Sequence, residues 1–173
     1  MSLKLLKIVN SAASGGRGVG SILHAIQLFG RNGLQRWLAV LSVGSSARSS
    51  AVERERTLVA LERARFCETI ALGTGLRGHA SALFLMGMLS CTLSLAGATT
   101  DDMVAQLRVS GDVSSALLGR DGLYTPVVAL ASAYMVADWV TAVEIGGRLR
   151  VLEQLPGWYA GAATWAREAR DRM

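Results

Sequence analysis

"FLMGMLSCTLSLAG", Phe84 to Gly97, is the most apolar stretch of the chain, and its placement decides the fold. The segment from His79 to Gly97 contains no Asp, Glu, Lys or Arg, and about 18 residues of this kind are a transmembrane candidate. A helix that is apolar all round is also typical of the centre of a soluble bundle. Polar Ser90 and the central Gly87 favour the bundle, so we expect a buried core helix and no membrane partner.

The composition of the remaining chain favours an all-α domain. A length of 173 residues fits one domain, and 51% hydrophobic residues are enough to bury a sizeable core. Only two prolines interrupt possible helices, and no convincing strand pattern is present. We therefore predict a multi-helix bundle of about 8–10 helices with no sheet, covering residues 1–173 as a single domain.

Glycine clusters and helix caps divide the chain into predicted helices. The longest should run from Ala51 to Leu72, and the glycine-rich break from Gly73 to Gly78 separates it from the helix over 79–96. Further along we expect helices over 112–118, from 126 through 134, over 139–152 and over 157–170, after shorter helices in the first fifty residues.

Charge and cysteine content narrow the classes of partner. The formal net charge is +5 and comes mostly from arginine, which suits either carboxylate or phosphate partners or simply charged outer helix faces. No basic run interleaved with aromatic residues indicates a nucleic-acid partner. Cys67 and Cys91 lie in apolar helical patterns, as buried thiols of a reducing cytosol do. No secretory signal is present, so we expect a cytoplasmic location.

The residues that could carry chemistry are sparse. A metal site needs several converging ligands, yet His24 and His79 are the two histidines and neither has a ligand partner at helical spacing. Ser90 and Cys91 lie in an apolar helix, where burial without a cation makes a thiol inert. "SGGRGVG", residues 14–20, lacks the Lys-Ser/Thr of a phosphate-binding loop. These patterns predict no catalytic residue, no metal and no other cofactor.

Five segments resemble HDOD domains in the order in which they occur. "SLKLLKIVNSAASG" is similar to a helix that ends in N-S-A-x-x-G, and "SILHAIQLFGRNGLQRWLAV" is similar to the S-I-x-x-A-I/L-x-x-L-G motif and the Arg- and Trp-bearing helix that follow it. "LVALERARFCETIA", "ALFLMGMLSCTLSLAG" and "ALLGRDGLYTPVVALASAYMVADW" resemble the subgroup in which an HDOD domain follows an EAL cyclic di-GMP phosphodiesterase domain. The resemblance covers nearly the whole chain.

This resemblance implies a helical fold related to HD-domain metal phosphohydrolases. In those enzymes the helix that corresponds to residues 79–96 would carry G-L-L-H-D. The His-Asp pair of this motif binds the metal that activates water. Here Gly87, Met88 and Leu89 match the lead-in, and Ser90-Cys91 occupy the pair position. An earlier histidine is also missing, because Ala64-Arg65-Phe66 lies where it is expected. The resemblance therefore implies that metal-dependent phosphohydrolysis has been lost.

The resemblance also implies helices that normally precede "SLKLLKIVNSA" and are absent, so we expect a domain truncated at its N-terminus, without an EAL domain. Apolar surface exposed by their absence would favour a homodimer.

Three functions follow from these observations. The first is a non-catalytic bacterial signalling module that regulates a protein partner or an attached domain in cyclic di-GMP pathways. The second is a nucleotide-sensing domain in which Arg31, Arg36 and Trp37 hold phosphate and base. The third is a degenerate HD metal phosphohydrolase.

Overall fold

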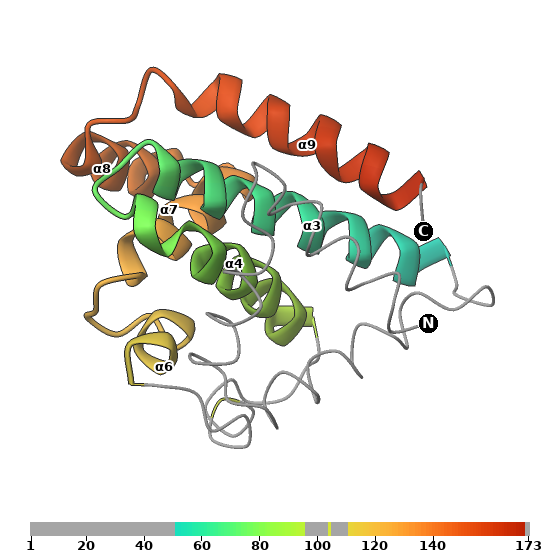
Figure 1. The fold of residues 1–173 in the computed structure, drawn as a ribbon, viewed down its shortest axis with the longest axis horizontal. Helices are drawn as coiled ribbons and strands as arrows, with labels where there is room; N and C mark the ends of the chain where they lie inside the picture. Colours follow the sequence, from blue (N-terminus) through green and yellow to red (C-terminus); the bar gives the residue numbers. More distant parts are fainter. Residues whose placement is uncertain (1–50, 96–103, 105–110, 172–173) are drawn as a thin grey trace.

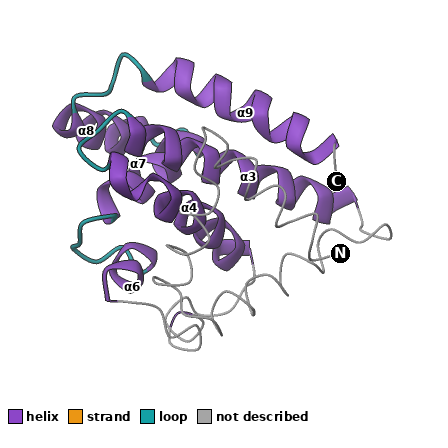
Figure 2. Ribbon diagram, in the orientation of Figure 1, coloured by secondary structure: helices purple, strands orange, loops and turns teal. Residues whose placement is uncertain are grey.

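The computed structural model describes residues 51–95, 104 and 111–171, and its regular elements in these ranges are all helices (Figures 1 and 2). The all-α prediction is confirmed, with no strand in the described residues. The elements are α3 (Ala51–Leu72), η1 (Arg77–His79), α4 (Ala80–Leu95), α6 (Gly111–Leu117), α7 (Thr125–Met135), α8 (Trp139–Leu149) and α9 (Leu155–Asp171).

Helix α3 is the centre of the bundle. α4 returns antiparallel along one side of α3, and α9 runs along the other side (Figure 1). α7 packs against both α3 and α4, and α6 fills the space beside α4 and α7. The arrangement explains why α3 has buried residues on several faces although its first turns are charged.

The apolar helix α4 is buried, as the sequence predicts. Every residue from Ala82 to Leu89 is buried, and α4 lies against α3, α6 and α7. In the part of the chain that the structure describes, no helix is both long enough and apolar enough to cross a membrane.

Helices α3 and α4 approach most closely at Gly87. A Cβ atom there would lie 2.8 Å from the Arg63 carbonyl oxygen, 2.9 Å from Cys67 Sγ and 3.0 Å from Ala64 Cα. Real Cβ atoms are essentially never closer than 3.0 Å to such atoms, so only glycine lets the two backbones meet here. The glycine that interrupts the apolar run is thus the contact point of the two core helices.

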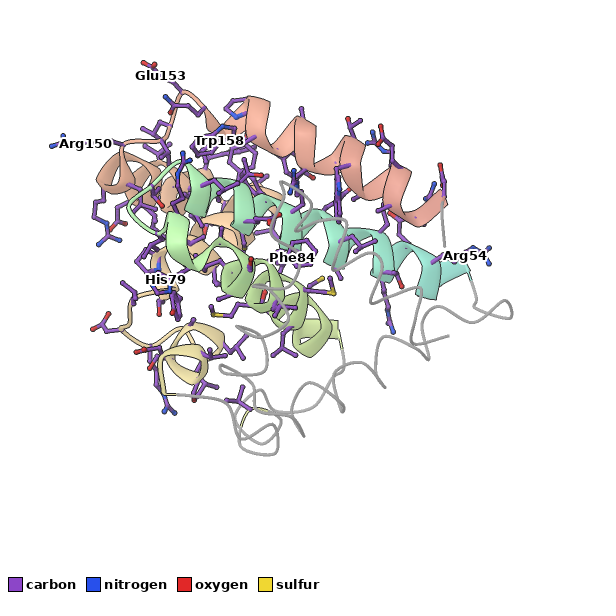
Figure 3. The ribbon with its side chains drawn as sticks, in the orientation of Figure 1. Arg54, His79, Phe84, Arg150, Glu153 and Trp158 are labelled. Atoms are coloured by element: carbon purple, nitrogen blue, oxygen red, sulfur yellow. The ribbon has the colours of Figure 1, made fainter. Side chains whose placement is uncertain are left out.

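Aromatic rings join α3 to the C-terminal helices. Phe66 is fully buried and makes edge-to-face contacts with Tyr134 of α7 and Tyr159 of α9, each with ring centroids 5.4 Å apart. Trp158 of α9 covers Gly73, where a Cβ would collide with the indole ring (Figure 3). The break after α3 is therefore also a docking point for α9.

Helices α6, α7 and α8 end in a left-handed turn. At the end of α8 the Arg150 N–H donates to the Gly147 carbonyl (3.1 Å) and the Val151 N–H to the Gly146 carbonyl (3.0 Å), the Schellman pattern. The left-handed residues of the three turns are Gly119, Ala137 and Arg150.

The predicted helix bounds differ from the observed bounds mainly around α8 and α9. The 51–72 prediction matches α3, and the 79–96 prediction matches α4 to within one residue at each end. The expected 139–152 helix stops at Leu149, because Arg150 turns left-handed. The 157–170 helix starts earlier, at Leu155, since Pro156 occupies a first-turn position that needs no N–H donor.

Candidate functional site

Ser90 and Cys91 lie on α4, one turn after its contact with α3. The half-buried Ser90 donates its hydroxyl hydrogen to the Gly87 carbonyl of its own helix, at 2.9 Å. Cys91 is a free cysteine with only 2% of its surface exposed. Burial raises the pKa of its thiol, so the thiol stays protonated near neutral pH. The Ser90 hydroxyl is thus bonded to the backbone of its own helix, and the Cys91 thiol is held in its protonated form.

A second thiol and an arginine complete this part of the α3–α4 interface. Cys67 is fully buried, and burial raises the pKa of its thiol to about 12. Arg63 is 9% exposed, and its Nε has no hydrogen-bond partner in the part of the chain that the structure describes. The Arg63 guanidinium is close enough to oppose the rise in pKa of both thiols, but desolvation outweighs it.

The charge of this cluster does not suit a divalent metal. The two thiols are neutral, and Arg63 contributes a positive charge at low exposure. Among the residues that the structure describes, a metal ion of charge +2 placed here would meet a cation and no anionic ligand, which is unfavourable in a medium of low dielectric constant. Cysteine thiolate could bind a metal, but both thiols would first have to lose a proton against a raised pKa.

The residues where an earlier histidine is expected are engaged in packing. Ala64 lies against Gly87. Arg65 turns to the α9 side, where it is 2.6 Å from a Glu68 carboxylate oxygen and 5.5 Å from the centre of the Trp165 ring. Phe66 points into the aromatic cluster with Tyr134 and Tyr159. Three successive positions of α3 thus serve three different contacts.

His79 has a structural partner. Its Nδ1 lies 3.0 Å from the Tyr124 hydroxyl, and the two ring planes are inclined by 56° with centroids 5.5 Å apart. The pair ties the start of α4 to the start of α7. Among the described residues no group of three or more His, Cys, Asp or Glu side chains could hold a metal ion.

The predicted ligand surface of Arg31, Arg36 and Trp37 lies outside the described residues, as does His24. Two features were missed by the sequence analysis. The buried position of Arg63 has no signature in an Arg- and Glu-rich helix half, and α8 carries apolar residues on its exposed side as well as on its buried side.

Comparison of the sequence with known proteins identifies a family and two relatives. The HDOD domain matches residues 1–117, which is more than half of the chain. The uncharacterized protein YuxH of Bacillus subtilis (strain 168) is 29% identical over 173 residues, which are 99% of this chain and 42% of YuxH. The cyclic di-GMP phosphodiesterase CdgJ of Vibrio cholerae serotype O1 (strain ATCC 39315 / El Tor Inaba N16961) is 31% identical over 140 residues, 80% of this chain and 32% of CdgJ.

The chain therefore spans less than half of the length of either relative. No solved structure matches it. The family match and the helical bundle agree with the resemblance drawn from the sequence: the chain belongs to the HDOD domain family.

Proposed function

We propose that the chain is a non-catalytic regulatory module that acts in the cytoplasm of a bacterium, in signalling linked to cyclic di-GMP. It would bind a protein partner or pass a conformational change to an attached domain. The observation that carries this proposal is the state of the pair position: Ser90 is hydrogen-bonded to its own helix, and Cys91 is a buried, protonated thiol beside the cation of Arg63. An HD-type metal site needs an imidazole and a carboxylate at this point.

The link to cyclic di-GMP rests on CdgJ, which is named a cyclic di-GMP phosphodiesterase. The matching segment is 32% of CdgJ, so the named activity can reside in the rest of that protein. We accordingly assign this chain to the subgroup of HDOD domains that accompany EAL domains, as a single HDOD-like domain over residues 1–173. Sequencing the gene upstream of the Met1 codon would test this assignment.

The absence of catalysis is directly testable with the purified chain. Hydrolysis of a chromogenic phosphate ester and of cyclic di-GMP would be measured with Mg²⁺, Mn²⁺, Fe²⁺ or no metal added, for the wild type and for Cys91→Ala. We expect no metal-dependent turnover by either protein. Metal-dependent hydrolysis that disappears in Cys91→Ala would overturn the proposal, whereas hydrolysis of equal rate in both proteins would indicate a contaminating enzyme.

The thiols supply a second measurement at the same site. Because burial raises the pKa of Cys67 to about 12 and that of Cys91 in the same direction, a thiol reagent at pH 8 should label neither in the native protein and both after denaturation. Rapid labelling of Cys91 in the native protein would show an accessible, ionisable thiol and would contradict the structural role proposed for it.

A further inference from the structure

The outer face of α8 carries an apolar surface. Val140 is 81% exposed, Trp139 56% and Val143 58%, and their spacing places them on one side of the helix. Ala142, Ile145 and Gly146 of the same helix are buried. Since a surface helix normally has a polar outer face, this outer surface is unusual.

Gly147 continues the same line of α8 by one turn, and we refer to Trp139, Val140, Val143 and Gly147 as the α8 stripe. Gly147 is exposed, and a Cβ built on it would meet only a Leu152 methyl carbon, at 3.8 Å. This ordinary contact shows that α8 itself does not require glycine here. Because Gly147 has no side chain, another helix can approach the α8 backbone closely at this point; the distance between two helix axes depends on the size of the side chains between them.

Trp139 is held in place from inside the bundle. Its ring packs edge-to-face against Tyr134 with centroids 5.4 Å apart, and Tyr134 in turn contacts Phe66 and Tyr159. A half-exposed tryptophan supported in this way loses little conformational freedom when a partner covers it. Tryptophans of this kind are frequent among the residues that dominate binding energy.

The charges beside the stripe favour a partner of the same sequence in the opposite direction. Asp138 caps the start of α8, accepting a hydrogen bond from the Thr141 N–H, while Arg148 and Arg150 lie at its end. Glu144 and Arg148 are an exposed pair 3.6 Å apart. An antiparallel copy of α8 would bring acids next to arginines, whereas a parallel copy would place like charges together.

The size of the surface fits a small symmetric contact. With Val136 in the preceding turn, which is 68% exposed, four large apolar side chains on this surface are each more than half exposed. A standard interface buries about 800 Å² on each partner, so the stripe would form the apolar centre and the flanking charged side chains the rim. Figure 1 places α8 at the opposite end of the molecule from the C-terminal end of α9.

We propose that two copies of this chain associate through their α8 stripes, packed antiparallel about a two-fold axis. In such an isologous interface each residue meets the same surface of the other copy. The inference deepens the proposed function because it names one protein partner of the module, yet the regulatory role can stand if self-association fails. The mass of the purified chain without any added partner therefore tests the dimer separately.

Sedimentation of the full chain across the micromolar range is the primary experiment. We expect a concentration-dependent dimer for the wild type and a dissociation constant about tenfold higher or more for Val140→Arg, which places a charge at the most exposed apolar residue of the stripe. Val52→Arg is the matched control. Val52 is 60% exposed and lies in the first turn of α3, outside the α8 stripe, so its variant should dimerise like the wild type.

Other outcomes overturn the proposal. A wild type that is monomeric throughout the range excludes the dimer, and a dimer unaffected by Val140→Arg places the contact elsewhere. Gly147→Arg separates folding from association, because Gly147 lies in a helix where arginine raises helix propensity. This variant should melt at the same temperature as the wild type or higher, and its dimer should nevertheless be weaker than the wild-type dimer. A Gly147→Arg protein that dimerises normally would contradict the proposed stripe.

A cysteine substitution tests the symmetry. With both native thiols buried, Val143→Cys near the proposed two-fold axis should form an intermolecular disulfide under mild oxidation, and Val52→Cys should not. Equal cross-linking of the two variants would indicate random collision and would contradict the two-fold contact.

Discussion

Helices α4 and α8 are both rich in apolar residues, but only α4 buries them on all sides. The residues from Ala82 to Leu89 are covered by α3, α6 and α7, whereas α8 presents Val140 and Val143 to solvent. Each helix also contains a glycine on an apolar line, Gly87 in α4 and Gly147 in α8. The first is pressed against a neighbouring backbone, whereas a Cβ at the second would make only an ordinary contact with Leu152. The apolar content of a helix therefore shows which surface would gain from burial. Whether that surface is buried within the domain depends on the neighbouring elements.

Leucine at the two glycines gives the largest expected contrast. In Gly87→Leu the Cβ already collides with the backbone of Arg63 and Ala64, and the remaining side chain must displace α3 from α4. We expect a loss of about 3 kcal/mol in the free energy of unfolding, or failure to fold. Gly147→Leu should be neutral or stabilise by about 0.5 kcal/mol, since leucine favours helix over glycine.

Chemical denaturation at a concentration where the chain is monomeric would measure both variants. Gly161→Ala on α9 is the control for helix propensity, because a Cβ at Gly161 meets nothing within 4 Å. A Gly87→Leu protein as stable as Gly147→Leu would contradict the close approach of α3 and α4.

A second prediction concerns the buried carboxylate on the α9 side of α3. Burial raises the pKa of Glu68 above its usual value of 4.5, while Arg65 opposes the rise. A raised pKa means that the folded protein binds a proton more tightly than the unfolded chain. Glu68 therefore contributes most stability below pH 4.5, and that contribution is lost as the pH rises through the folded pKa. The loss of unfolding free energy amounts to about 1.4 kcal/mol for each unit by which the pKa is raised. Glu68→Gln should remove this pH-dependent loss.

The measurement is the difference in unfolding free energy between wild type and Glu68→Gln as a function of pH. Arg65→Met serves as the internal comparison: without the nearby guanidinium the pKa of Glu68 should rise further, and stability should continue to fall to higher pH. A wild-type minus Glu68→Gln difference that stays constant from pH 4 to pH 8 would show that Glu68 is not desolvated in the folded state.

The smallest expected effect lies at the end of α8. Arg150 adopts φ 58° and ψ 42°, a left-handed conformation that costs a residue with a side chain about 1 kcal/mol. Arg150→Gly should raise the unfolding free energy by roughly 0.5 kcal/mol, because the relief is partly offset by the greater freedom of glycine in the unfolded chain. In the reciprocal variant, Gly119→Ala, the left-handed glycine at φ 66° is replaced, and thermal melting should show a loss of about 1 kcal/mol. Destabilisation by Arg150→Gly would show that the arginine side chain makes a contribution larger than the strain.

The sequence was sufficient for the core helices and insufficient for the surface around α8. Glycine clusters and apolar periodicity predicted α3 and α4 to within a residue, since both signals are local. The ends of α7 and α8 carry no such signal, because Ala137 and Arg150 occupy positions that usually hold glycine. The Arg65–Glu68–Trp165 contacts join segments about a hundred residues apart, and such packing leaves no periodic trace.

The candidate site divides in the same way. The resemblance predicts that Ser90-Cys91 stand where a metal-binding pair would be, and the structure adds that the Cys91 thiol is buried near Arg63, with a pKa raised by desolvation. Arg31, Arg36 and Trp37 remain a prediction, because they lie outside the described residues.

The two left-handed residues that bracket α8 have a consequence for motion. α8 packs chiefly against α7 and is entered at Ala137 and left at Arg150, both in a conformation that costs free energy. Opening of α8 alone would release that strain and expose little of the α3–α4 core, so its amide hydrogens should exchange with solvent earlier than those of α3 or α4. The segment that carries the α8 stripe would then be more easily remodelled than the two core helices. A second molecule that covers it would slow its exchange as well as bury its surface.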